Sequence, residues 1–196
     1  KKNKIKSHLS RSPYSIYQKR KTTINNAFAS AIAPMDEYDG AIMGVALQLL
    51  GQDPDGDLKC VYCGSDAETW DHLIGLVKKG ELHGYGHQLG NLVPCCKKCN
   101  SEKGGKDWED YLREKLPDPS AFAEKRGRIA SYRDRYAALV NLEHAKKQSP
   151  DDWALYGQIN DEILMLMKKA DVVAARLRDT IRQSFEKQKP VGGWPE

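Results

Sequence analysis

The chain has 196 residues, of which 40% are hydrophobic and 30% are charged, and its formal net charge is +4. This length suffices for one compact domain, or for a small core with helical additions. No apolar run is long enough to cross a bilayer, and no apolar segment of the secretory kind follows the basic N-terminus. We therefore expect a cytoplasmic protein that makes no membrane contact.

The positive charge is concentrated near the N-terminus. Residues 1–35 contain eight Lys or Arg and no Asp or Glu, which leaves 23 of the 31 basic residues against 27 acidic ones in the rest of the chain. A basic segment on a mildly acidic body is typical of proteins that contact a polyanion. We predict nucleic-acid contacts there, with Lys19, Arg20 and Lys21 as candidates. The alternative is a solvated surface that only keeps the protein in solution.

Two helices are predicted before the cysteines begin. Residues 1–12 are expected to form a flexible basic arm, and a helix should run from residue 13 or 15 to about residue 33, where a proline ends it. A second helix is predicted over 36–50, followed by Gly51 at the position where helices favour a left-handed residue. The turn-forming residues 52–57 then mark a boundary.

The chain beyond residue 118 is helical in character. Apolar residues at helical spacing predict a helix over 121–147, and Ser149-Pro150 is typical of the start of a last helix that reaches about residue 187. In that helix, apolar residues alternate at spacings of four and three: Ile159, Ile163, Leu166, Ala170, Val173 and Leu177. This seam allows a coiled coil with a second copy or another protein, or an antiparallel hairpin with 121–147, which we favour.

The five cysteines indicate a metal site. All lie within forty residues, and four of them form two C-x-x-C pairs, Cys60 with Cys63 and Cys96 with Cys99. Four thiolates satisfy the tetrahedral preference of Zn²⁺, which predicts a structural zinc site. A redox dithiol would explain one such pair but not two at matched spacing. Cys95 does not fit the spacing, and we expect a packed thiol there.

The segment between the two pairs indicates the function. It contains Asp71-His72, then Asn91 before a second apolar stretch, and the second pair is followed by Asn100 and Lys103 in the order Cys-Asn-x-x-Lys. Framed by two cysteine pairs, this order resembles the HNH endonuclease family, also described as ββα-metal or His-Me finger nucleases. The last position of the motif is Asn rather than His, so the chain resembles the H-N-N variant. The resemblance covers about residues 58–112.

The resemblance implies a role for each residue of the motif. A β-hairpin and a helix would surround one catalytic divalent ion, Mg²⁺ or Mn²⁺, bound by Asp71 and Asn100. His72 would be the general base, and Asn91 would order the hairpin loop through hydrogen bonds. Lys103 would contact phosphate.

The residue types also suit this chemistry independently of the resemblance. Phosphodiester hydrolysis needs an activated water, for which a histidine near its free pKa is suited, and positive charge beside the scissile phosphate. Hard ions take oxygen ligands, so thiolates would serve a separate ion. Taken alone, Asp71 is better explained as an acidic residue of a turn and His72 as a structural histidine. Their occurrence together, in this order between two cysteine pairs, favours a catalytic role. His87, in a glycine-rich loop, is a candidate for accessory phosphate or metal binding.

We therefore expect a mostly helical α+β protein, with a small zinc-framed ββα-metal core flanked by N-terminal helices and a long C-terminal helical hairpin. The predicted segments are a basic arm with N-terminal helices (1–51), the nuclease core (52–118) and a helical region (119–196). The predicted function is a metal-dependent DNA endonuclease in restriction or antiviral defence. DNA rather than RNA follows from the family resemblance alone.

Two alternatives stay open from the sequence. One is a nuclease subunit that is active only beside a partner, such as the ATPase of a defence system. The other is a non-catalytic, zinc-stabilised DNA-binding module. The intact Asp71, His72 and Asn100 favour an enzyme over the second alternative.

Overall fold

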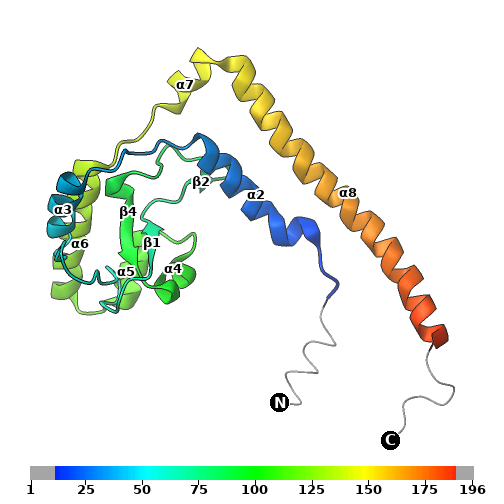
Figure 1. The fold of residues 1–196 in the computed structure, drawn as a ribbon, viewed down its shortest axis with the longest axis horizontal. Coiled ribbons are helices and arrows are strands. Elements are labelled where there is room, and N and C mark those ends of the chain that lie inside the picture. Colours follow the sequence, from blue (N-terminus) through cyan, green and yellow to red (C-terminus); the bar gives the residue numbers. More distant parts are fainter. Residues whose placement is uncertain (1–11, 189–196) are drawn as a thin grey trace, which may run out of the picture. The chain divides into compact units, whose positions relative to one another are not determined.

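The computed structural model describes residues 12–188, which form a mostly helical α+β structure with two small antiparallel sheets and a long C-terminal helix (Figure 1). The predicted fold class is confirmed at this level. The predicted basic arm lies outside the described residues, apart from residue 12. Contacts divide the chain into two compact units, one formed by residues 26–148 and the other by the residues up to 25 together with those from 149 onward.

Two helices precede the sheet residues, close to their predicted positions. Helix α2 spans Ile16–Ile32 and helix α3 spans Gly40–Leu49. Helix α3 begins four residues later than expected, because the Asp39 carboxylate accepts hydrogen bonds from two amides of its first turn. Gly51 follows α3 with φ 74°, the left-handed conformation expected there.

The centre of the larger unit is a ββα arrangement. Strands β1 (Thr69–His72) and β4 (Leu92–Cys95) pair antiparallel, with His72 opposite Leu92. Helix α4 (Lys97–Lys103) follows β4 directly and packs against β1. Strand β1 ends at His72, since the Asn91 side chain takes the backbone groups of Ile74 that a continuing strand would pair.

Short elements connect and cover these strands. A second hairpin is formed by β2 (Val77–Lys78) and β3 (Glu81–Leu82), and a 3₁₀ turn, η1 (Leu89–Asn91), leads into β4. Helices α5 (Trp108–Lys115) and α6 (Pro119–Tyr136) complete the layer, and α3 and η1 both pack on α6. The shared core includes the fully buried side chains of Tyr62, Val93, Leu112, Ile129 and Tyr132.

Helix α6 approaches the backbone of η1 closely. The Tyr132 hydroxyl contacts the carbonyl oxygens of Leu89 and Leu92, the latter at 2.6 Å. A Cβ atom on Gly90 would lie 2.3 Å from the backbone nitrogen of Ala137, so only glycine fits there. These contacts fix the start of β4 against the end of α6.

The predicted single helix over 121–147 is wrong. Helix α6 ends at Tyr136, and the chain is extended before α7 (Leu142–Gln148) begins. The reason is that the Val140 amide donates to the carbonyl of Gly84, in the loop before η1, rather than to a carbonyl of the preceding helical turn.

The last helix, α8, spans Pro150–Gln188, as predicted to within one residue. Its partner in the smaller unit is the start of α2: Asp171 accepts hydrogen bonds from the Ser15 hydroxyl and from the amides of Ile16 and Tyr17. Residues up to 148 group with the larger unit, whereas α8 groups with the start of α2. Between residues 12 and 188, no helix is both long and apolar enough to span a bilayer.

Candidate metal centre and catalytic site

The two cysteine pairs come together in the larger unit. The Sγ atoms of Cys60, Cys63, Cys96 and Cys99 all lie within 4.8 Å of one another, and those of Cys63 and Cys96 are 3.7 Å apart. Bonds of about 2.3 Å from four sulfurs to one tetrahedral ion would place the sulfurs about 3.8 Å apart. Gly64, with φ 77°, makes the turn after the first pair. The cluster could hold one metal ion, with every ligand position filled by sulfur.

Cys95 lies beside this cluster as a buried thiol, as predicted. Its Sγ is 3.9 Å from the Sγ of Cys60, and it also contacts the carbonyl of Cys96. The hydrogen bond donated by the Cys95 thiol lowers the pKa of Cys60 to about 4. This contact favours the thiolate of Cys60, which is the form that binds metals.

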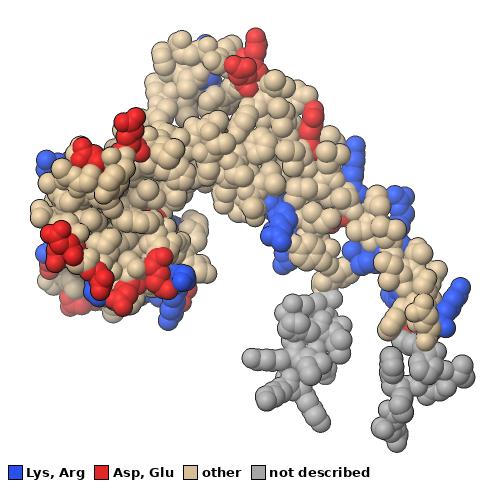
Figure 2. All heavy atoms as spheres, viewed as in Figure 1, with Lys and Arg blue, Asp and Glu red and all other residues tan. Residues whose placement is uncertain are grey.

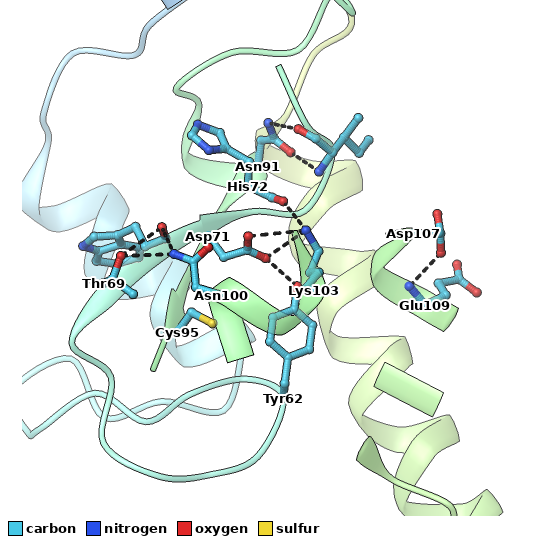
Figure 3. A network of polar contacts seen from close by, with 12 residues as sticks. Tyr62, Thr69, Asp71, His72, Asn91, Cys95, Asn100, Lys103, Asp107 and Glu109 are labelled. Carbon is cyan, nitrogen blue, oxygen red and sulfur yellow. Dashed lines mark hydrogen bonds and ion pairs between the residues drawn. The ribbon is translucent and has the colours of Figure 1, made fainter. Parts of the chain in front are cut away.

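Asp71 is buried, and its carboxylate is contacted by one residue from each of the two cysteine-containing segments (Figure 3). The hydroxyl of Tyr62, inside the first C-x-x-C pair, donates to Oδ2 at 2.8 Å. The ammonium group of Lys103, at the end of α4, lies 3.1 Å from the same oxygen. Burial raises the pKa of Asp71, while Lys103 and Tyr62 act in the opposite direction. Tyr62 was not identified from the sequence, although an aromatic residue inside a cysteine pair was a visible signal.

Lys103 does not have the position expected of a phosphate contact. Its side chain is 2% exposed, and its Nζ donates to the carbonyl oxygen of His72 at 2.8 Å as well as pairing with Asp71. The expectation is corrected: Lys103 turns inward onto β1 and supplies the counter-charge for Asp71. The spacing Cys-Asn-x-x-Lys did not reveal the direction of this side chain.

His72 and His87 form a direct pair. His72 Nε2 lies 3.1 Å from His87 Nδ1. Burial, with smaller effects of His87 and Lys103, lowers the pKa of His72 to about 4, so its imidazole is neutral near pH 7. His87 is fixed through its backbone, whose amide donates to Pro34 and whose carbonyl accepts from Asp36. The structure thus brings together two histidines that the sequence places fifteen residues apart.

The two asparagines of the motif have different surroundings. Asn91 is fully buried, and its amide bonds to both backbone groups of Ile74 and to the carbonyl of Gly86 at 2.8–3.0 Å. Asn100 is half-buried, and its Nδ2 donates to Thr69 Oγ1 and to the carbonyl of Trp70 at 3.2 Å. The Oδ1 atom of Asn100 is thus left to accept a hydrogen bond or to bind an ion.

The residues present offer a second ion few ligands. Among residues 12–188, the four cysteines are the only group of three or more His, Cys, Asp and Glu side chains close enough to hold an ion. A second ion near β1 would depend on the oxygens of Asp71 and Asn100 together with water. Each carboxylate oxygen has two lone pairs, so the bonds from Tyr62 and Lys103 leave acceptor capacity on Asp71. This oxygen set suits a hard ion such as Mg²⁺, which keeps several waters.

Basic side chains gather in the smaller unit, which Figure 2 shows along α2 and the C-terminal half of α8. Lys19 and Arg20 are exposed, and the Nζ of Lys21 lies 5.5 Å from the ring centre of Tyr17. Residues 168–187 of α8 add six Lys or Arg against three Asp or Glu. This second basic stretch is not visible in the charge of the chain beyond residue 35, where acidic residues outnumber basic ones.

The comparisons add no relative. The chain matches no protein-family model, and searches among curated proteins and solved structures find no match to it.

The Lys103–Asp71 pair yields a stability prediction. Lys103→Met should lower the free energy of unfolding by about 3 to 5 kcal/mol, because Asp71 is then buried without a counter-charge. Adding Asp71→Asn should recover about 1 to 3 kcal/mol relative to the sum of the single effects. Urea unfolding measures all three variants, with Lys98→Met, an exposed lysine of the same helix, as the matched control. Strictly additive effects would contradict the pairing.

Proposed function

We propose that the protein is a metal-dependent endonuclease that hydrolyses phosphodiester bonds in DNA, with His72 as the general base. The proposal rests mainly on one arrangement: a neutral, half-buried His72 follows the buried Asp71 on a strand that packs against the helix carrying Asn100. A neutral imidazole accepts a proton from water, which is the task of a general base, but the lowered pKa makes His72 a weaker base than the histidine near its free pKa that the sequence predicted. The resemblance to HNH nucleases supplies the substrate class.

The roles of the two histidines follow from their contact. In the tautomer we assign, the Nε2–H of His72 donates to Nδ1 of His87, which leaves the Nδ1 lone pair of His72 for the attacking water. His87 is then a positioning residue that keeps the base in its tautomer. Asn91 holds the loop that carries His87, through its bond to Gly86.

Asp71 and Asn100 would hold a divalent ion, Mg²⁺ or Mn²⁺. Such an ion would stabilise negative charge on the scissile phosphate and on the leaving oxygen. Tyr62 and Lys103 keep the Asp71 carboxylate in one orientation before any ion or substrate arrives.

The metal of the cysteine cluster is proposed to be zinc, with a structural role. Four sulfur ligands leave no position for a water or substrate, which is typical of structural zinc sites. The ion would join the segment before β1 to the start of α4. Metal binding therefore contributes to folding of the larger unit.

DNA contacts are proposed for the basic residues of the smaller unit, namely Lys19, Arg20 and Lys21 with the basic half of α8. Contacts of this kind are independent of sequence and release counterions. A cytoplasmic role in restriction or antiviral defence is consistent with such a nuclease.

Pairing of two copies through α8 is the second part of the proposal. None of the described residues of α8 is buried, and Ile159, Leu166, Val173 and Leu177 are 41–60% exposed along one seam. Acids dominate the start of α8 and bases its end, so two antiparallel copies would place opposite charges together. The same seam would serve a nuclease that needs a partner, which is the competing hypothesis.

The nuclease test is nicking of supercoiled plasmid by the full chain with Mg²⁺ or Mn²⁺. Wild-type protein should nick the plasmid, and His72→Ala should lower the rate about 10²- to 10⁴-fold, because the general base is lost. His144→Ala, an exposed histidine on α7, is the matched control and should cut like wild type. Failure of folded, metal-loaded wild type to cut would favour the partner-dependent subunit or the non-catalytic module.

The zinc test is native mass spectrometry combined with thermal unfolding. Wild type should carry one zinc ion, and Cys63→Ser should lose it and unfold at a lower temperature, because one of four ligands is missing. Cys95→Ala should keep the ion, since Cys95 is outside the ligand group. Equal zinc loss in both variants would require a different ligand set.

The test of α8 is the molar mass in solution by light scattering. Wild type should have the mass of two chains, and the double variant Leu166→Glu/Val173→Glu the mass of one, because charges enter the seam. Val172→Glu is the matched control, since Val172 is 61% exposed and lies on another face of the same helix. A monomeric wild type would overturn self-pairing.

A further inference from the structure

A pocket of about 350 Å³ lies beside the proposed general base, within residues 26–148. Its walls come from the segment before α3, from β1 and β4, and from the end of α6. Three aromatic side chains line it: Tyr38, Trp70 and Tyr136. This volume is near the lower end of the range of about 300 to 1,000 Å³ typical of ligand pockets.

The pocket is continuous with the catalytic face of β1. Trp70 and His72 point to the same face of the strand, because side chains alternate along it. Leu92, another wall residue, is paired with His72 across the ladder. A third wall residue, His87, contacts the His72 ring directly. A ligand in the pocket would therefore lie next to the group bound at His72.

The mouth of the pocket presents aromatic rings to solvent. Tyr38 is 85% exposed and Trp70 is 38% exposed, although both are large side chains. Exposed aromatic residues beside a nucleic-acid site are the usual platforms for stacking unpaired bases. The sequence favours a packing role for Trp70 under the hairpin over a role in base stacking, whereas the structure leaves its side chain partly exposed at the pocket.

The charges around the pocket exclude a phosphate as its ligand. No Lys or Arg within the described part of the chain lines it, whereas Asp36, Glu37 and Asp39 do. The Asp36 carboxylate accepts from the Leu89 amide, and Asp39 caps α3, so these two have structural tasks. Glu37 is exposed at the rim, where its carboxylate can accept a hydrogen bond from an exocyclic amino group.

We propose that this pocket receives one unstacked nucleobase of the substrate, adjacent to the phosphate to be cut. The inference rests on the proposed nuclease function and narrows its substrate to DNA with an unpaired or extrudable base, such as a bulge or a single-stranded segment. Extruding a base from a regular duplex costs stacking and pairing energy, so an already unpaired base binds more favourably. A base with an exocyclic amino group (cytosine, adenine or guanine) is preferred over thymine through Glu37.

The test measures binding without cutting, in buffer to which no Mg²⁺ or Mn²⁺ is added. The probes are two fluorescein-labelled duplexes with a single 2-aminopurine, which is bulged in one and paired in the other. The bulged duplex should bind about ten-fold tighter, and its 2-aminopurine fluorescence should fall as the base stacks. Equal affinities, or an unchanged 2-aminopurine signal in the bound bulged duplex, would overturn the inference.

Variants of the aromatic residues assign the effect to this pocket. Trp70→Ala and Tyr38→Ala should each weaken binding of the bulged duplex about five- to ten-fold and leave binding of the paired duplex unchanged. Trp70→Phe should keep most of the affinity, because it retains a ring. Tyr38→Ala is safe for folding, since that side chain is largely in solvent. Tyr14→Ala, an exposed aromatic that does not line the pocket, is the matched control. Equal weakening of both duplexes would contradict the assignment.

Cleavage of the same duplexes with Mg²⁺ separates the two proposals. If the protein prefers the bulged duplex in binding but cuts neither duplex, the base-pocket proposal stands and the nuclease proposal is overturned. If the protein cuts paired and bulged DNA at equal rates and Trp70→Ala does not change these rates, the nuclease proposal stands and the base-pocket proposal is overturned.

Discussion

The buried carboxylate of Asp71 is the constraint on which the rest of the site depends. A charge at this depth requires donors, and they come from two segments that flank it in the chain: Tyr62 from the first cysteine pair and Lys103 from the helix that begins inside the second. Removing one donor from such a group costs more than the hydrogen bond itself, because the charge remains without compensation. The position of one strand is thereby tied to both halves of the cysteine frame.

The positions of the cysteine cluster and of the β1 residues therefore depend on each other. Tyr62 packs edge-on against Tyr111 of α5, with ring centres 5.1 Å apart. This contact anchors the first cysteine pair to the hydrophobic core. An ion in the cysteine cluster would take no part in the proposed catalysis. It would nevertheless determine the orientation of the Asp71 carboxylate. Preorganisation by surrounding groups of this kind is what allows a site with few ligands to work.

Local patterns in the sequence predicted the elements better than their partners. The cysteine spacing, the left-handed residue at Gly51 and the length of α8 follow from rules that act over a few residues, and the structure agrees with them to within a few positions. The inward turn of Lys103 and the pairing of α8 with α2 depend on contacts between residues far apart in sequence. Periodicity indicates which face of a helix is apolar, but it does not indicate what covers that face.

The roles at the site divide in the same way. Asp71, His72, Asn91 and Asn100 were candidates because the order of residue types resembles a known motif, whereas Tyr62 and the direct contact of His87 with His72 are seen only in the structure. His87 is placed by a backbone bridge to the segment between α2 and α3, which no side-chain pattern records.

Two glycines allow backbones to touch around this site. A Cβ atom would lie 1.9 Å from the carbonyl oxygen of Pro34 at Gly86, and 2.3 Å from a backbone nitrogen at Gly90. In a saturation mutagenesis screen scored by activity, both positions would tolerate no replacement, although neither offers a functional group. Intolerance to substitution is thus a poor indicator of a catalytic role in this protein. A screen would need a parallel measurement of folded protein to separate residues required for folding from residues required for activity.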